Sequence, residues 1–396
     1  MTEMTVKIKK QAAAKMKKGY PLIEASSVNG ELLCEEGTVL RLVDDEGMFI
    51  GKGYYGKQNK GVGWILTNRE SETIDTTFFE NRLQYAFQKR SSFLQSDSTT
   101  AFRLFNGEGD GVGGVTIDYY SGYYVCTWYS EGMYTFRSDI YKALESIVSF
   151  KGIYEKKRFD LRGQYVEDDD FVMGERGEFP LLVKENDMTF AVYLNDGPMV
   201  GVFLDQRDVR LAIRTRYAKG KDVLNTFSYT GAFSVAAALG GAVKTTSVDL
   251  AKRSLPKTIE QFRMNDLDHE SQDIIVMDVF DYFKYAKRNS KSFDLVILDP
   301  PSFARSKKRT FSSAKDYTSL LQEAIAITNK NGVIVASTNN ATFGIDKFHT
   351  FIAKAFSRER VKYEIVEQYT LPEDFQTTKS FREGNYLKVV FVRKLS

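Results

Sequence analysis

Four apolar stretches in the second half of the chain each end near a polar side chain: Asn225, Asp249, Asp278 and Asp299. Short apolar runs of this kind are typical of buried parallel strands, and ligands of open α/β sheets bind at the carboxyl ends of such strands. A carboxylate at one end can accept both hydroxyl groups of a ribose, and a carboxylate at another can read the edge of an adenine. The set predicts a site for an adenosine that carries an amino-acid tail.

The turn after the first stretch joins a predicted strand to a predicted helix and contains one glycine, Gly231. It offers backbone amides and a helix N-terminus to an anionic group such as a carboxylate. A dinucleotide pyrophosphate needs the closer approach that several glycines allow, in the pattern Gly-x-Gly-x-x-Gly. The sequence therefore disfavours a dehydrogenase.

The fourth stretch stops at Asp299-Pro300-Pro301. Prolines lack an amide hydrogen and fix their own φ angles, so the strand cannot continue and the backbone that leaves Asp299 is rigid. Such a turn can hold the polar edge of a nucleobase at a fixed distance from a cofactor; an ordinary proline turn is the alternative. Three cations follow closely: Lys307, Lys308 and Arg309. We expect them to contact phosphate, the alternative being a solvated run of charge.

Strand and helix signals alternate from about residue 197 to the end, which is the pattern of a doubly wound sheet. Strands are predicted at 222–226, 244–248, 273–277, 293–298, 332–337, 362–369 and 386–393. Helices are predicted near 206–217, 231–239, 251–264, 315–329 and 346–357. The predicted fold class of this part is α/β and Rossmann-like.

Two smaller modules are predicted before it. Short β-like runs at 38–43, 48–51 and 62–66 indicate a small β-barrel. The next part mixes strands and helices and is predicted to be an α+β middle domain. The expected domains are residues 1–75, 76–195 and 196–396.

Several local features are expected in the middle domain. A helix is predicted from Thr77, with Glu80 completing a capping box. The glycines of residues 106–114 predict tight turns and close backbone approach, and no Gly-Lys-Ser/Thr follows to make a phosphate loop. Residues 163–176 are predicted to be a polar loop, and residues 181–194 a hairpin.

Composition narrows the class of protein. The two cysteines, Cys34 and Cys126, lie far apart and give no disulfide framework, and no signal-peptide pattern is present, so we expect a cytoplasmic protein. No run of eighteen apolar residues predicts a membrane span. Two histidines argue against a His-based zinc site, and no metal is predicted. A net charge of +3 permits a polyanionic partner if the positive charge is clustered.

Taken together, these motifs resemble a bacterial family of rRNA large-subunit methyltransferases. Its members carry an N-terminal PUA domain and a class I S-adenosylmethionine-dependent methyltransferase domain, and they usually carry a cytosine-C5 label. The matching stretches are residues 103–114 (RLFNGEGDGVGG), 201–207 (GVFLDQR), 225–233 (NTFSYTGAF) and 299–303 (DPPSF), with Asp249 and Asp278. The resemblance covers nearly the whole chain and is weakest in residues 1–75.

This resemblance implies S-adenosylmethionine as the cofactor and large-subunit (23S) rRNA as the partner; the sequence also permits a homodimer. The methionine end of the cofactor would be lined by Phe203, Asp205, Gln206 and Arg207. The first cofactor loop would be formed by Asn225, Phe227, Tyr229, Thr230 and Gly231. Asp249 would bind the ribose, Asp278 the adenine, and Asp299-Pro300-Pro301 would face the base.

One departure from the family concerns its nucleophile. Members that methylate carbon 5 of cytosine use a cysteine thiolate, which activates the ring by attacking carbon 6. The two positions used for that cysteine hold Asn339 and Ser302 here. The pair Asn339-Asn340 resembles the guanine-N7 methylating domain of a related two-headed rRNA enzyme. A nitrogen already has a lone pair and needs only positioning and electrostatics.

The sequence therefore predicts methylation of a guanine nitrogen, with Asn339 and Asn340 at the base; alternatively, these two residues only brace their loop. A cytosine-C5 methyltransferase and a non-catalytic RNA-binding factor of ribosome assembly are the competing hypotheses. A small-molecule methyltransferase is disfavoured by the barrel.

Overall fold

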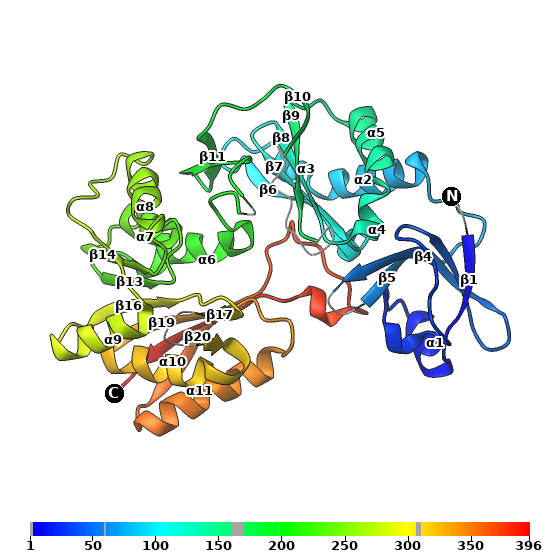
Figure 1. The fold of residues 1–396 in the computed structure, drawn as a ribbon. Coiled ribbons are helices and arrows are strands. Elements are labelled where there is room, and N and C mark those ends of the chain that lie inside the picture. The colour runs from blue at the N-terminus through cyan, green and yellow to red at the C-terminus, as the bar shows by residue number, and fades with distance from the viewer. Residues whose placement is uncertain (1–2, 59–60, 160–169, 198, 306–309) are drawn as a thin grey trace. The chain divides into compact units, whose positions relative to one another are not determined.

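The computed structural model describes residues 3–58, 61–159, 170–197, 199–305 and 310–396. They form two compact units (Figure 1). The N-terminal unit comprises Met1–Val183, Val192–Val200 and Glu373–Gly384. The C-terminal unit comprises Lys184–Ala191, Gly201–Pro372 and Asn385–Ser396. The three domain boundaries expected from the sequence remain a prediction.

The N-terminal unit begins with a five-stranded sheet in the order β1-β3-β4-β5-β2. Its elements are β1 (Glu3–Lys7), α1 (Lys10–Met16), β2 (Leu22–Ile23), the 3-10 turn Ala25–Ser27, β3 (Val39–Val43), β4 (Phe49–Gln58) and β5 (Gly61–Thr67). Alternate apolar residues such as Leu40 and Leu42 are fully buried, as the predicted strand over 38–43 requires.

A second five-stranded sheet, in the order β10-β9-β8-β7-β6, follows in the same unit. Its strands are β6 (Ala101–Asn106), β7 (Val115–Tyr120), β8 (Tyr123–Trp128), β9 (Gly152–Lys157) and β10 (Phe171–Gly174). The helices are α2 (Thr76–Lys89), α3 (Ser91–Leu94), α4 (Glu131–Tyr134) and α5 (Arg137–Ile147), with a 3-10 turn at Gly107–Asp110. The hairpin β11 (Leu181–Glu185) and β12 (Met188–Val192) confirms the one predicted there.

Two local predictions for this part were wrong. The N-cap of α2 is Asp75, whose carboxylate accepts from the Phe78 amide at 3.0 Å, and Glu80 instead accepts from the Ser146 hydroxyl. Asp75, and not the predicted capping box, caps the helix because it directly precedes the first helical turn. In the predicted loop, residues 171–174 form β10, since they pair with β9; residues 163–169 lie outside the described part of the chain.

The glycine-rich turn of residues 106–114 makes the close approaches predicted for it. A Cβ at Gly109 would lie 1.8 Å from the Gln376 carbonyl oxygen, and a Cβ at Gly113 would lie 2.2 Å from the Trp64 ring. Any side chain at either position would displace its neighbour. The turn therefore packs directly against the first sheet and against the segment Glu373–Gly384.

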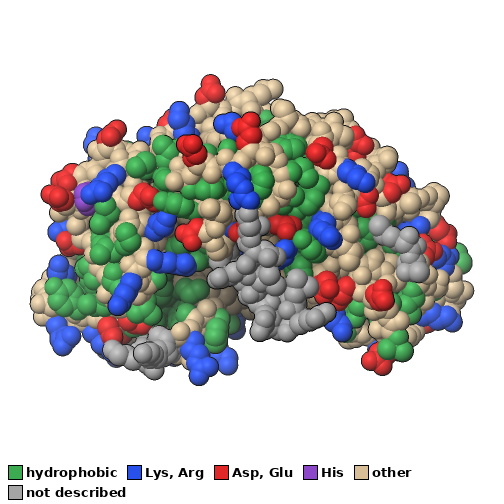
Figure 2. Space-filling model, turned by 45° about the horizontal axis from the view of Figure 1, so that its top comes forward, with side chains coloured by type: hydrophobic (Ala, Val, Ile, Leu, Met, Phe, Trp, Pro, Cys, Tyr) green, Lys and Arg blue, Asp and Glu red, His purple; other side chains and the backbone are tan. Residues whose placement is uncertain are grey.

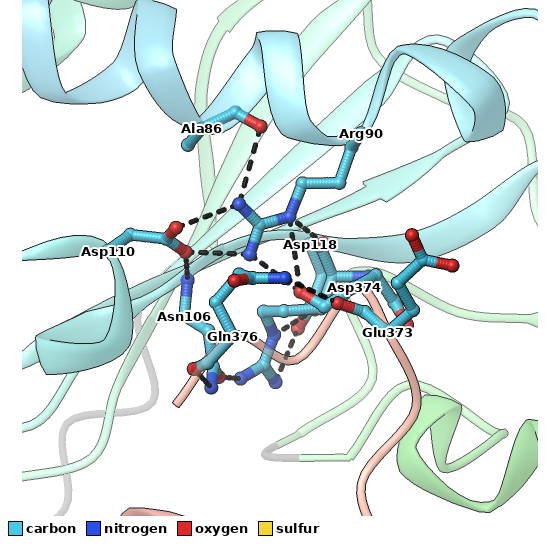
Figure 3. A network of polar contacts seen from close by, with 9 residues as sticks. Ala86, Arg90, Asn106, Asp110, Asp118, Glu373, Asp374 and Gln376 are labelled. Carbon is cyan, nitrogen blue, oxygen red and sulfur yellow. Dashed lines mark hydrogen bonds and ion pairs between the residues drawn. The ribbon is translucent and has the colours of Figure 1, made fainter. Parts of the chain in front are cut away.

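Segment Glu373–Gly384 is held by a buried ionic network (Figure 3). The Arg90 guanidinium, 0% exposed, donates to both Asp110 carboxylate oxygens at 2.8 and 2.7 Å and to the Asp374 carbonyl at 2.6 Å. Asn106 donates to the Gln376 carbonyl at 2.7 Å. In the sequence the segment lies between the last two strands, Tyr363–Tyr369 and Lys388–Lys394, which belong to the C-terminal unit, so nothing local predicts that the segment belongs to the N-terminal unit.

The C-terminal unit is built on a seven-stranded sheet in the order β15-β14-β13-β16-β19-β21-β20. The strands are β13 (Asp222–Thr226), β14 (Lys244–Asp249), β15 (Asp273–Val276), β16 (Phe293–Leu298), β19 (Thr328–Thr338), β20 (Tyr363–Tyr369) and β21 (Lys388–Lys394). All seven predicted strands are confirmed. The first five are parallel and β21 is antiparallel to both its neighbours.

Helices cover both faces of this sheet (Figure 1). They are α6 (Arg207–Ala212), which continues as a π-helix at Ile213–Tyr217, α7 (Ala232–Leu239), α8 (Ser254–Arg263), α9 (Val279–Arg288), α10 (Ser313–Ile327) and α11 (Ile345–Glu359). Short elements are β17 (Phe303–Arg305), β18 (Thr310–Ser312) and the 3-10 turns Leu204–Gln206 and Arg382–Gly384, the last in the N-terminal unit. Helix α9 was not predicted, and neither was the hairpin of β17 and β18.

Candidate functional site

The parallel register brings the polar strand ends of the C-terminal unit to one edge of the sheet. Thr226 pairs with both Val248 and Leu298, and Leu298 pairs with Ala336. The residues that follow these strands therefore leave the sheet side by side. This confirms the expectation that the chemistry-bearing residues share one edge.

The loop after β13 has an unusual backbone. The φ angle is positive at three alternate residues: Phe227 (54°), Tyr229 (52°) and Gly231 (78°). Such angles cost about 1–3 kcal/mol at non-glycine residues and are concentrated at ligand sites. Left-handed residues that alternate along a loop turn successive amides toward one point and make an anion-binding concavity. Gly231 is also required by space, because a Cβ there would lie 2.5 Å from Thr258.

Asp249 is held in one orientation beside this loop. Its two carboxylate oxygens accept from the Tyr229 amide at 2.9 Å and the Ala251 amide at 2.8 Å. The residue is partly exposed, so each oxygen keeps a lone pair for a ligand. This geometry fits a carboxylate that accepts the two hydroxyl groups of a ribose.

Asn225 and Asp278 have structural partners of their own. The Asn225 amide is fully buried and donates to the Ser234 hydroxyl at 3.0 Å, so it supports the loop from beneath. Asp278 is the N-cap of α9 and accepts from the Phe280 and Asp281 amides at 3.0 and 3.3 Å. These bonds use one oxygen of Asp278, which leaves the other for the predicted contact with adenine.

Residues Gly201–Arg207 are bonded to the same loop. Thr230 donates to the Gly201 carbonyl at 2.6 Å, and the Phe203 ring, 46% exposed, lies 5.2 Å from the Tyr229 ring. Gln206 is buried and its amide nitrogen contacts Asp299 at 3.2 Å and the Ser337 hydroxyl at 2.8 Å. The predicted methionine end and the predicted base side are therefore linked through Gln206.

Three residues that support this segment were missed from the sequence: Arg210, Glu185 and Tyr386. Arg210 forms a buried bidentate ion pair with Glu185, at 2.7 and 2.6 Å, and donates to the Phe203 carbonyl at 2.7 Å. The Tyr386 hydroxyl donates to Asp205 at 2.9 Å. Arg207 is 4% exposed, with its Nε 3.7 Å from Asp208. Arg210, Glu185 and Tyr386 have partners that are distant in the sequence, so no local pattern identifies them, whereas Arg207 was predicted.

Asp299 lies at the start of the rigid turn with an altered acidity. Burial raises the pKa of the Asp299 carboxyl to about 6, and the charge of Asp205 adds to this, while hydrogen bonds from Ser337 and Gln206 oppose it. Pro300 is buried and Pro301 is exposed. The Tyr317 hydroxyl, buried behind the site, donates to the Ser337 carbonyl at 2.6 Å and lies 3.4 Å from the Leu298 carbonyl. It ties the ends of β16 and β19 together.

Ser302 and Asn339 lie next to each other. The Ser302 hydroxyl donates to the Asn339 side-chain oxygen at 2.6 Å, and Asn339 is exposed. Asn340 instead is buried: its amide donates to Ser313 at 2.9 Å and accepts from the Thr342 amide at 2.9 Å. The bonds of Asn340 fit the bracing role that the sequence left open, whereas Asn339 faces outward.

The remaining expectations concern charge, thiols and metals. Lys307, Lys308 and Arg309 lie outside the described residues. On the face shown in Figure 2, Lys and Arg side chains are interspersed with Asp and Glu. Burial raises the pKa of the Cys126 thiol well above its usual range. Within the described ranges, no group of three or more His, Cys, Asp or Glu could hold a metal, and no helix is long and apolar enough to cross a membrane.

Comparison with known proteins assigns the family. A family model described as S-adenosylmethionine-dependent methyltransferase matches residues 102–389, and one described as PUA-like domain matches residues 6–68. The chain belongs to the S-adenosylmethionine-dependent methyltransferases. S-Adenosylmethionine is thus its cofactor, and the Rossmann-like fold predicted from the sequence is confirmed.

Relatives of this methyltransferase match over nearly its whole length. The Bacillus subtilis protein named "Putative ribosomal RNA large subunit methyltransferase YwbD" is 62% identical over 98% of both chains. Ribosomal RNA large subunit methyltransferase I of Klebsiella pneumoniae is 32% identical over 89% of this chain and 88% of its own. The crystal structure of SMU.776 complexed with SAH is 41% identical and covers 99% of this chain and 100% of its own, with a TM-score of 0.92.

Proposed function

We propose that this methyltransferase modifies a ring nitrogen of a guanine in large-subunit rRNA, in the cytoplasm. The observation that carries the choice of atom is the pair Ser302 and Asn339, joined at 2.6 Å beside Asp299. These are the two places at which related cytosine-C5 enzymes are expected to carry their cysteine. Neither residue has thiolate character, and a hydroxyl without an adjacent base is a weak nucleophile.

The RNA substrate is supported by the relatives and by the first domain. Proteins that match this chain over almost their full length are named ribosomal RNA large subunit methyltransferases. The PUA-like domain adds a second module that the chemistry on a small molecule would not need. An RNA substrate would also supply the phosphates that we propose as partners of Lys307, Lys308 and Arg309.

The residues of the site divide into cofactor-holding and base-holding groups. We assign Phe203, Asp205, Gln206 and Arg207 to the methionine end. The loop of Asn225, Phe227, Tyr229, Thr230 and Gly231 would receive the carboxylate, Asp249 the ribose and Asp278 the adenine. When bound, S-adenosylmethionine supplies an electrophilic methyl group on a sulfonium.

The chain's own contribution would be orientation. Pro300 and Pro301 fix the backbone that carries Asp299, which can accept from a ring or exocyclic N–H of guanine. The outward amide of Asn339 can donate to an acceptor on the same base, while Asn340 keeps the loop in place. Methylation of nitrogen needs the lone pair about 3–3.5 Å from the methyl carbon, and such placement supplies most of the catalysis.

The test is methyl transfer in vitro to rRNA from a strain that lacks the gene, followed by mass spectrometry of the nucleosides. We expect a methylguanosine that appears with the wild type and falls at least about 100-fold with Asn339→Ala. Ser290→Ala, an exposed residue of the same unit, is the control. A 5-methylcytidine product, or a covalent adduct with 5-fluorocytosine RNA that Cys34→Ser or Cys126→Ser abolishes, would refute the choice of atom. Cofactor binding without transfer to any RNA would support the non-catalytic assembly factor instead.

A further inference from the structure

A cavity of about 240 Å³ lies within the N-terminal unit, and none of the residues that line it belongs to the candidate site of the C-terminal unit. This volume far exceeds the roughly 10–15 Å³ that a single water needs, so the cavity has room for a ligand such as a heterocyclic base. The walls come from the end of α1, the end of β5, helix α2, the glycine-rich turn and segment Glu373–Gly384. The apolar part of the wall consists of Met16, Tyr20, Pro21, Ile65 and Leu66.

Arg82 is the cation of this cavity, and one of its donors has no acceptor. A terminal nitrogen lies 3.4 Å from the Leu66 carbonyl and 3.7 Å from the Glu72 carboxylate, and the guanidinium stacks 4.8 Å from the Phe78 ring. Its Nε–H is buried and has no partner among the described residues. A buried donor left unsatisfied is costly, so this group is suited to an acceptor that arrives with a ligand.

Glu108 is the anion of the same cavity, and it is not ion-paired with Arg82. Burial raises the pKa of its carboxyl to about 7, with Arg103 opposing the rise and Asp110 adding to it, and its hydrogen bond is to its own backbone amide. Gly384 leaves the carboxylate its space, since a Cβ there would lie 2.8 Å from the Glu108 Oε1. The carboxylate therefore has acceptor capacity available to a ligand.

We propose that this cavity binds an unpaired guanine of the RNA substrate. Guanine offers two adjacent donors, N1–H and the 2-amino group, which match a carboxylate, and two adjacent acceptors, O6 and N7, which match an arginine. Adenine has a donor where guanine has O6, and it lacks the N1 hydrogen. The apolar wall would cover the face of the ring, as in pockets that receive a base turned out of its stack. The inference rests on the proposed action on RNA.

The test measures fluorescence anisotropy of the full chain with labelled octauridylates that carry one central guanine, adenine, inosine or 7-deazaguanine. The assay is run near pH 8, where the Glu108 carboxyl is mostly ionised. We expect guanine to bind at least about tenfold more tightly than adenine, with inosine and 7-deazaguanine in between, because each lacks one partner group. Equal affinity for guanine and adenine would overturn the proposal.

Variants assign the contacts. Glu108→Gln should abolish the preference for guanine over inosine. Arg82→Lys should abolish the preference for guanine over 7-deazaguanine. Glu46→Gln, an exposed glutamate in a turn of the same unit, should leave both preferences intact. Wild-type preferences that persist in Glu108→Gln would refute the assignment, and the base analogues test the wild type even if a variant fails to fold. Methyl transfer to rRNA by a wild type without any base preference would refute the pocket alone and leave the proposed function standing.

Discussion

Replacing Asp299 with asparagine should stabilise the protein at neutral pH while it lowers methyl transfer. Burial raises the pKa of this carboxyl from 3.8 to about 6, so the native state binds the proton more tightly than the unfolded chain does. Stability contributed by this group therefore rises as the pH falls from 6 toward 3.8, and above pH 6 the ionised carboxylate carries its full cost. At 1.36 kcal/mol per pH unit, that cost is about 3 kcal/mol, an upper value because the residue is partly exposed.

Urea unfolding of the wild type and Asp299→Asn measures this cost. Asparagine keeps the shape of the side chain and can still accept from Gln206, so the variant removes the charge without leaving a cavity. We expect a gain of about 1–3 kcal/mol near pH 7.5 that shrinks to near zero at about pH 4, where the wild-type carboxyl is itself largely protonated. Asp346→Asn, at an exposed position in the first turn of α11, should instead lose about 0.3–1 kcal/mol. A variant less stable than the wild type near pH 7.5, or a gain that does not change with pH, would contradict the reasoning.

Three further outcomes are expected. Asp249→Ala should weaken binding of S-adenosylhomocysteine at least about 100-fold in calorimetry, since two hydrogen bonds to a charged group at about 1.5–3 kcal/mol each are lost; unchanged affinity would exclude a ribose contact. Arg90→Met should lower the free energy of unfolding by about 3–5 kcal/mol, because it leaves a buried carboxylate without its partner, and an unaffected urea midpoint would contradict this. Affinity for rRNA should fall as salt rises, and the triple alanine variant of Lys307, Lys308 and Arg309 should flatten that dependence, whereas an unchanged slope would remove these cations from the interface.

The elements that the sequence predicted best are strands whose successive side chains are all buried in the core. Strands β16, β19 and β21 of the C-terminal unit are buried over most of their length, so each contains a continuous apolar stretch, whereas β14, β15 and β20 are more polar or less buried. Helix α9 was missed because its apolar side chains follow directly on the apolar run of β15. Asp278 was interpreted only as a ligand residue, and its cap bonds show that a helix also begins there.

Other features depend on contacts that no local pattern contains. Aromatic residues disfavour a positive φ angle, yet Phe227 and Tyr229 adopt it because Asp249 and Gly201 hold the loop from outside. The same applies to Arg90, whose partners Asp110 and Asp374 are 20 and 284 positions away. From the sequence alone, a buried arginine whose partners are this distant cannot be distinguished from an arginine exposed to solvent.

The sequence gives no reason to assign different roles to Asn339 and Asn340, but their contacts in the structure differ. Lys388, which is 4% exposed and whose pKa burial lowers to about 8, donates to the Asn340 carbonyl at 3.0 Å, and Ser313 holds the Asn340 side chain. Asn340 thus anchors the loop. Its neighbour Asn339 accepts from the Ser302 hydroxyl, which orients the side chain, and both N–H donors of the Asn339 amide can be offered to a base.

These donors bear on the proposed choice of base. Beside carbon 5, cytosine carries an exocyclic amino group, which is itself a donor and would oppose the Asn339 amide. Beside N7, guanine carries O6, which is an acceptor and would match it. A donor oriented by Ser302, at the position where the resemblance places the thiol of cytosine-C5 enzymes, therefore supports the proposal of guanine through its hydrogen bonding as well as through its lack of nucleophilicity. Both effects originate in the same pair of side chains, 37 positions apart in the sequence and in contact in the fold.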